Sequence, residues 1–176
     1  MRLYRTRIPQ IANAVIERLC ADGDIDVAVD DRPEAEQDLV AIMETFLKRD
    51  LDLRDAVKDT MSRRNIPYDH YSKVRAEIAE AWGHPTGESV KKYLARQFVE
   101  NFMISRFVLE VFTEDEPLFR KILEIIRSFD VDEKALREEA KAQIKNEVEG
   151  TVDYEIAFAQ ALKEVKRRQG LLPKRA

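Results

Sequence analysis

Apolar residues recur every three or four positions through most of the chain, which is the spacing of one face of an α-helix. In the first half, this pattern predicts four helices, beginning near Ile8, Asp31, Asp52 and Tyr71. In the second half, it predicts four more, within 90–112, 113–129, 130–150 and 151–170. The pattern therefore predicts an all-α protein, a helical bundle of about eight helices.

One short segment departs from helical spacing. Between Ala21 and Asp30, acidic and apolar residues alternate, as in the Asp-Ile-Asp-Val of 24–27. Alternation is typical of a short exposed strand, and an acidic loop would look the same. Because no second strand pattern lies nearby, we favour the loop.

Residues that mark helix ends repeat between the first and second halves of the chain. The Asp-Arg-Pro of 31–33 returns as Asp-Glu-Pro at 115–117, and the Asp-Leu-Asp of 50–52 returns as Asp-Val-Asp at 130–132. Capping acids and first-turn prolines start helices in unrelated proteins too, so independent reuse is the alternative to an internal repeat. We favour two related halves.

The boundary between these halves is expected at a cluster of glycine and proline near the centre of the chain, 83–87. Such clusters interrupt regular structure. The predicted organisation is an N-terminal helical half with an acidic loop (1–83), a hinge (84–89), and a C-terminal half with an apolar central helix and a basic tail (90–176). A helix-ending glycine closes each half, at Gly83 and Gly170.

Composition excludes several classes of protein. The 176 residues carry 34 acidic and 30 basic side chains, so the net charge of −4 provides no overall field that would hold a polyanion. The longest mainly apolar stretch, 98–112, contains charged residues and is shorter than the ~20 residues of a membrane span. With a single cysteine and no signal-peptide pattern, we expect a cytoplasmic protein.

The acidic segment does not match a calcium loop. Aspartates at 22, 24 and 26 have the spacing of the first three ligands. A calcium loop then needs glycine at its sixth position and a carboxylate at its twelfth, where this chain has Val27 and Pro33. A solvated acidic segment is the favoured interpretation.

Other catalytic and metal-binding patterns are also missing. The soft or imidazole ligands that zinc prefers are Cys20, His70 and His84, with no close pair among them. No glycine-rich phosphate-binding motif occurs. We therefore expect a protein that is not an enzyme, with no catalytic, cofactor-binding or metal-binding residues and no cofactor. An enzyme with a site between the halves ranks third among the hypotheses.

The candidate functional residues are instead suited to interactions. Five of the eight phenylalanines lie within 98–119, so this part is either the core where the halves meet or a self-association surface. Basic residues before the first helix and at the end of the last helix could contact nucleic acid, although cations also stabilise helix C-termini. The selected interaction residues are Phe98, Phe102, Arg106, Phe107, Lys166, Arg167 and Arg168.

We therefore expect an interaction or scaffold protein of unknown process, whose partner is another protein or a second copy of itself. The alternative is a nucleic-acid-associated factor that uses Arg2, Arg5, Arg7 and the basic helix end at 166–168.

Three features carry a family resemblance: the opening Met-Arg-Leu, the early apolar helix followed by an acidic segment, and the closing Glu-Val-Lys-Arg-Arg-Gln-Gly of 164–170. Together they resemble the uncharacterised bacterial family catalogued as domain of unknown function 507. The resemblance implies a bacterial origin and implies that each half is similar to one family unit, in tandem. It brings no known catalytic residue, ligand or partner.

Overall fold

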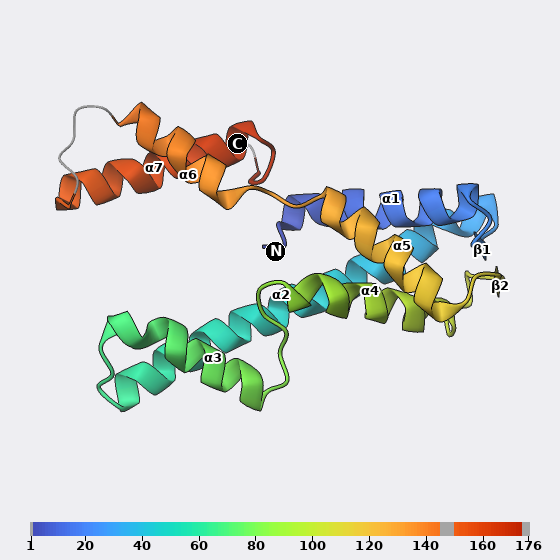
Figure 1. Cartoon of the computed structure of the whole chain (residues 1–176), viewed down its shortest axis with the longest axis horizontal. Helices are drawn as coiled ribbons and strands as arrows, with labels where there is room; N and C mark the ends of the chain where they lie inside the picture. The colour runs from blue at the N-terminus through green and yellow to red at the C-terminus, as the bar shows by residue number, and fades with distance from the viewer. Residues whose placement is uncertain (1, 145–149, 174–176) are drawn as a thin grey trace.

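The computed structural model describes residues 2–144 and 150–173, which are mainly α-helical (Figure 1). The helices are α1 (Ile8–Ala21), α2 (Arg32–Arg63), α3 (Tyr71–Ala81), α4 (Ser89–Phe102), α5 (Asp115–Ser128), α6 (Glu133–Gln143) and α7 (Val152–Arg168). Three-residue 3-10 turns are η1 (Arg5–Arg7), η2 (Val29–Asp31) and η3 (Tyr68–His70). Two short strands are β1 (Ile25–Asp26) and β2 (Glu110–Val111). The expectation of about eight helices is therefore too high for the described residues.

The difference arises at α2, which is one continuous helix where the sequence predicted two. It runs from Arg32 to Arg63 through the Asp-Leu-Asp of 50–52. That segment contains neither proline nor glycine, so nothing in the backbone forces a break. Leu53 and Val57 are fully buried beyond it, so packing supports the helix on both sides.

The predicted helix 90–112 is too long, and the predicted acidic loop contains a strand. α4 ends at Phe102, and β2 follows within the remaining segment. β2 pairs antiparallel with β1, with Ile25 opposite Val111 and Asp26 opposite Glu110. The partner of β1 comes from the other half of the chain, so a search for a neighbouring strand pattern could not find it.

Four helical segments form a central bundle, made of α1, the first part of α2, α4 and α5 (Figure 1). The β1–β2 ribbon lies at one end of this bundle. Two helical hairpins extend from the opposite end. We call residues 50–63 of α2 with α3 the first arm, and α6 with α7 the second arm.

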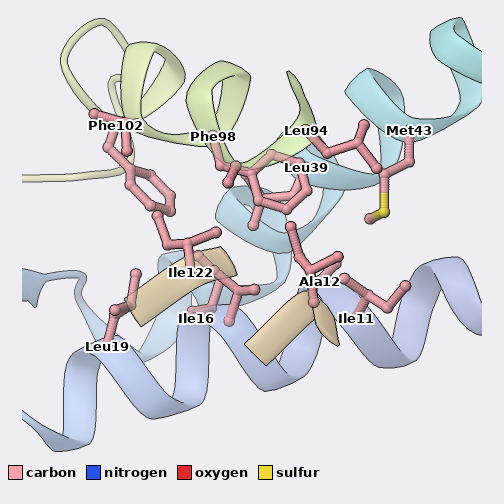
Figure 2. Packing of buried hydrophobic residues seen from close by; sticks show 14 of the residues in the cluster. Ile11, Ala12, Ile16, Leu19, Leu39, Met43, Leu94, Phe98, Phe102 and Ile122 are labelled. Carbon is pink, nitrogen blue, oxygen red and sulfur yellow. The ribbon is translucent and has the colours of Figure 1, made fainter. Parts of the chain in front are cut away.

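The main hydrophobic core lies inside the central bundle and takes residues from both sides of 84–89. Figure 2 shows Phe98 of α4 among apolar side chains of α1 and α2, and the same cluster includes Ile122 of α5. Each arm has a smaller core of its own, which contains Val57 and Val74 in the first arm and Leu136 and Val165 in the second. The segment 84–89 thus connects α3, which belongs to the core of the first arm, to α4, which belongs to the main core. Since the main core also contains residues from before this segment, a division of the chain there stays a prediction.

Glycines end α3 and α7 as predicted. Gly83 and Gly170 adopt positive φ values of 59° and 69°, a region that disfavours other residues. After each glycine, a backbone N–H turns back to the helix: His84 donates to the carbonyl of Ala79, and Leu171 donates to that of Lys166, both at 2.8 Å. These are the bonds of a Schellman-type helix ending.

The predicted helix caps are confirmed only in part. The Asp132 carboxylate accepts the backbone N–H groups of Lys134 and Ala135 at 3.0 Å and so caps α6. Asp31 precedes α2 but its side chain makes no capping hydrogen bond, and proline in the first turn supports that helix start instead. Gly150 does not end α6, which stops at Gln143.

Replacing Phe98 tests the position of the core. We expect Phe98→Ala to lower the free energy of unfolding by about 3–5 kcal/mol, because the ring is fully buried and its loss leaves a cavity. Phe112→Ala is the control, since this ring is exposed and its loss should change stability by no more than about 0.5 kcal/mol. Urea unfolding measures both, and equal effects would contradict the assignment.

Candidate functional site

The aromatic residues selected from the sequence belong to the core. Phe98 and Phe102 are buried, and Phe107 is half-buried against the same cluster. Arg106 is exposed and lies over the Phe107 ring, 4.8 Å from its centroid. Arg106 lies in the non-helical segment after α4, whereas Glu110 lies in β2, so the two residues do not share a helix. The apolar side chains of 98–102 are therefore unavailable to a partner.

The basic residues at the end of α7 are engaged within the second arm. The Lys166 ammonium is largely buried and lies 3.0 Å from Glu133. Arg167 pairs with Glu164 at 2.6 Å, and Arg168 pairs with Glu139. The pairs of Lys166 and Arg168 join α7 to α6, and the pair of Arg167 with Glu164 lies within α7. The last part of the predicted basic tail, 174–176, lies outside the described residues.

Tyr4 connects the start of the chain to the base of the second arm. Its hydroxyl donates to the Glu133 carboxylate, and Lys166 lies 5.4 Å from its ring centroid. Burial and the adjacent carboxylate raise the pKa of Tyr4. Burial alone would raise the pKa of Glu133, but the hydrogen bonds from Tyr4 and Lys166 outweigh it and hold that pKa below its ordinary value. This network fixes residues near the N-terminus between the two arms.

A cleft with a volume of about 560 Å³ lies between the bases of the arms. Its walls come from the start of the chain, the middle of α2, the segment before α4, and residues 171–173 after α7. We call it the arm cleft. Segments that are far apart in the sequence meet here because the central bundle brings both arms to the same end.

The arm cleft is locally basic although the chain as a whole is acidic. Among the described residues, four arginines line it, Arg2, Arg5, Arg54 and Arg75, and Asp50 is the only lining carboxylate. Arg75 donates to Asp50 at 2.6 Å. Among residues 2–144 and 150–173, none forms an ion pair with Arg5 or Arg54, and both side chains belong to exposed residues. These two guanidinium groups are placed to receive anionic groups from outside.

Between the arginines, the lining of the arm cleft is apolar. Tyr4 and Phe46 are almost fully buried, whereas Leu51 is about half exposed (48%). Thr6 also lines the cleft, and within the described part of the chain its buried hydroxyl has no hydrogen-bond partner. The apolar lining residues are Leu3, Tyr4, Phe46, Leu47, Leu51, Pro85, Val90, Leu171, Leu172 and Pro173.

His84 stabilises the base of the first arm beside the cleft. Its side chain is fully buried and stacks on Phe46, with ring centroids 5.0 Å apart and planes inclined by 10°. Its Nε2 lies 3.3 Å from the Asp50 carboxylate. Burial lowers the pKa of His84 below its ordinary value, although the carboxylate opposes this shift. The imidazole is therefore neutral at pH 7.

The other chemically reactive candidates lie apart from His84. Cys20 is on α1, packed against the central core, and burial raises the pKa of its thiol. His70 lies in η3, at the far end of the first arm. In the described ranges, no group of three or more histidine, cysteine or acidic residues is placed to hold a metal ion.

Only part of the arm cleft is recognisable in the sequence. Arg2 and Arg5 were noted as a basic cluster, whereas Arg54 and Arg75 lie on amphipathic helices and look like ordinary solvated residues. No local signal identifies them, because they reach the cleft only through the packing of α2 against α3 and α4.

The buried imidazole makes stability depend on pH. Since the pKa of His84 is below 6.5 in the folded protein, the unfolded chain takes up a proton first as pH falls, and the free energy of unfolding decreases below about pH 6.5. We expect this decrease between pH 7.5 and 5.5 to be smaller in His84→Gln, measured by urea unfolding. The control His70→Gln, at an exposed site, should keep the wild-type profile; the opposite ranking would refute the assignment.

Lys166 is expected to hold the second arm in place. Lys166→Ala leaves Glu133 without its main cation, and the free energy of unfolding should fall by about 2–3 kcal/mol, at the low end for a buried pair because Glu133 is partly exposed. Hydrogen exchange should accelerate in α6 and α7 while α1 and α4 stay protected. Lys163→Ala, at an exposed site on the same helix, is the control. Unchanged exchange in α6 would contradict this role.

Comparison with known protein families gives one match over nearly the whole chain. Residues 1–171 match the model of a family described as a protein of unknown function, DUF507. This match treats the chain as one unit rather than assigning a unit to each half. Among curated proteins, no significant match was found. No described helix is long and apolar enough to cross a membrane. On the extent of the family match, the chain belongs to the DUF507 family.

Proposed function

We propose that this protein is a non-catalytic interaction or scaffold protein of the bacterial cytoplasm, and that it binds a protein partner in the arm cleft. The observation that carries the proposal is the lining of the cleft, where Arg5 and Arg54 are free of ion pairs within the described chain beside exposed Leu51. Guanidinium groups beside apolar side chains suit a protein surface that presents both carboxylates and apolar residues.

The features of the cleft favour protein over nucleic acid. Single-stranded nucleic acid binds through aromatic rings on which bases stack. The aromatic residues of the cleft, Tyr4 and Phe46, are only 5% and 7% exposed and offer no such platform. The basic end of α7 is also engaged with acidic side chains of its own arm.

A nucleic-acid-associated factor remains the second candidate, because four arginines gather in the cleft. Arg2 and Arg5, which the sequence selected for this role, are joined there by Arg54 and Arg75. Phosphate groups would be held by this charge alone, so such binding would weaken steeply with salt.

We also propose that the two halves are related by duplication. The order of elements supports this. The first half contains α1, β1, α2 and α3, and the second contains α4, β2, α5, α6 and α7. In this correspondence α4 matches α1, β2 matches β1, α5 and α6 together match the long helix α2, and α7 matches α3. In each half the first helix packs on the second, and a hairpin arm follows that ends at Gly83 or Gly170. The arm cleft would then lie between two related arms.

A pull-down with matched variants tests the binding site. The cleft variant carries Arg5→Glu and Arg54→Glu, and the control variant carries Lys92→Glu and Arg137→Glu, which are exposed and outside the cleft. We expect partner proteins identified by mass spectrometry from the native host to be retained by wild type and control and lost from the cleft variant. Circular dichroism verifies that both variants fold.

Two outcomes would contradict the proposal. Partners that bind the cleft variant as well as the wild type would place the binding site elsewhere. Submicromolar binding of an oligonucleotide that decreases with salt and is lost in the cleft variant would establish the second candidate instead.

A further inference from the structure

The end of the molecule opposite the arms carries an unusual number of exposed apolar side chains. Val29, Ile104, Leu109 and Phe112 all lie within a few residues of β1 or β2, and each is 60–83% exposed. The neighbouring strands β1 and β2 are at the far end of the bundle from the arm cleft (Figure 1). Clustered exposed apolar side chains are characteristic of interaction surfaces.

Acidic side chains surround these apolar residues. Asp26, Asp30, Glu110 and Glu114 are exposed. Across the described residues, none of these four carboxylates takes part in an ion pair, and the nearest exposed cation in sequence, Arg106, lies over Phe107. We call these four acids, together with Val29, Ile104, Leu109 and Phe112, the ribbon end.

The ribbon end and the arm cleft are complementary in chemistry. The first presents carboxylates beside exposed apolar side chains, and the second presents Arg5 and Arg54 beside Leu51. Complementary charge brings such surfaces together and suppresses like-charged alternatives, while contact between the apolar groups removes them from water. The two surfaces lie at opposite ends of one molecule, so they cannot meet within a single chain.

We propose that the ribbon end of a second copy of this chain binds in the arm cleft, so that copies associate head to tail. Carboxylates such as Glu110 would pair with Arg5 and Arg54, and Leu109 or Phe112 would contact Leu51. The contact joins two different surfaces, so each added copy leaves one free cleft and one free ribbon end, and assembly continues unless the geometry closes a ring. This inference rests on the proposed function, because it uses the arm cleft as a protein-binding site.

Sedimentation velocity of the full-length protein tests the association. We expect the mean mass to rise above the monomer value of 20.5 kDa as concentration increases, and to fall back toward it in high salt because surface charges are then screened. A ribbon variant carries Leu109→Ser and Glu110→Lys, both at exposed positions. The ribbon variant and the cleft variant alone should each associate at least about a hundredfold more weakly, because like charges would face one another.

Mixing the two variants identifies the head-to-tail contact. The cleft variant keeps an intact ribbon end, and the ribbon variant keeps an intact cleft. An equimolar mixture should therefore recover association, with near wild-type affinity at the contact between the intact ribbon end and the intact cleft. A contact between two copies of the same surface would give no such recovery. The control variant Lys92→Glu with Arg137→Glu should associate as the wild type does.

Three results would overturn the inference: a monomer at all concentrations up to about 1 mM, association that neither variant weakens, or variants that fail to combine. The pull-down distinguishes these failures from failure of the proposed function. If the chain is monomeric but the cleft variant loses partner proteins, the cleft binds another protein and only self-association is refuted. If the cleft variant loses neither partners nor self-association, both proposals fail.

Discussion

The packing of α4 against α2 and α5, with α1 completing the same core around Phe98, sets the positions of the other parts. Phe98, Leu94 and Phe102 come from the second half of the chain and fill the space between helices of the first (Figure 2). The core that buries these side chains contains residues of both halves. Because the core is shared, both arms extend from the same end of the bundle, and the arm cleft forms between them. The β1–β2 ribbon is a further product of this packing, since each strand belongs to a different half.

Sequence periodicity predicted the helices well where burial is local and failed where it depends on distant segments. The apolar stripe of α1 and the glycine ends at Gly83 and Gly170 were recognisable because periodicity and backbone conformation act within a few residues. The strand at Ile25 was missed because its partner lies in the other half. The end of α4 was missed because apolar residues continue beyond Phe102, although only Phe107, Val108 and Val111 of that segment pack on the core, and they do so without a helix.

The candidate site was less predictable than the fold. Arg2 and Arg5 stood out as a local cluster, but nothing near Arg54 or Arg75 distinguishes them from solvated helix residues. Conversely, the conspicuous basic run at 166–168 is engaged with Glu133, Glu139 and Glu164, because long cationic side chains on one helix of a hairpin reach acids on the other as well as on their own. The local density of basic residues thus overestimated the free charge at the end of α7 and did not reveal Arg54 and Arg75 in the arm cleft. Tertiary contacts decide which charged side chains are paired.

The unbroken course of α2 makes the two arms mechanically different. This helix has 32 residues and spans about 48 Å at 1.5 Å per residue, from inside the core to the far end of the first arm. The second arm is joined to α5 through residues 129–132, which are not helical. Bending the first arm would require bending a helix anchored in the core, whereas the position of the second arm depends on the contacts of this short connection, including the ion pair between Asp130 and the buried Lys91 of α4. The width of the arm cleft therefore depends on how the second arm is held against the bundle. The contacts of Tyr4 and Lys166 with Glu133 hold that arm at its base.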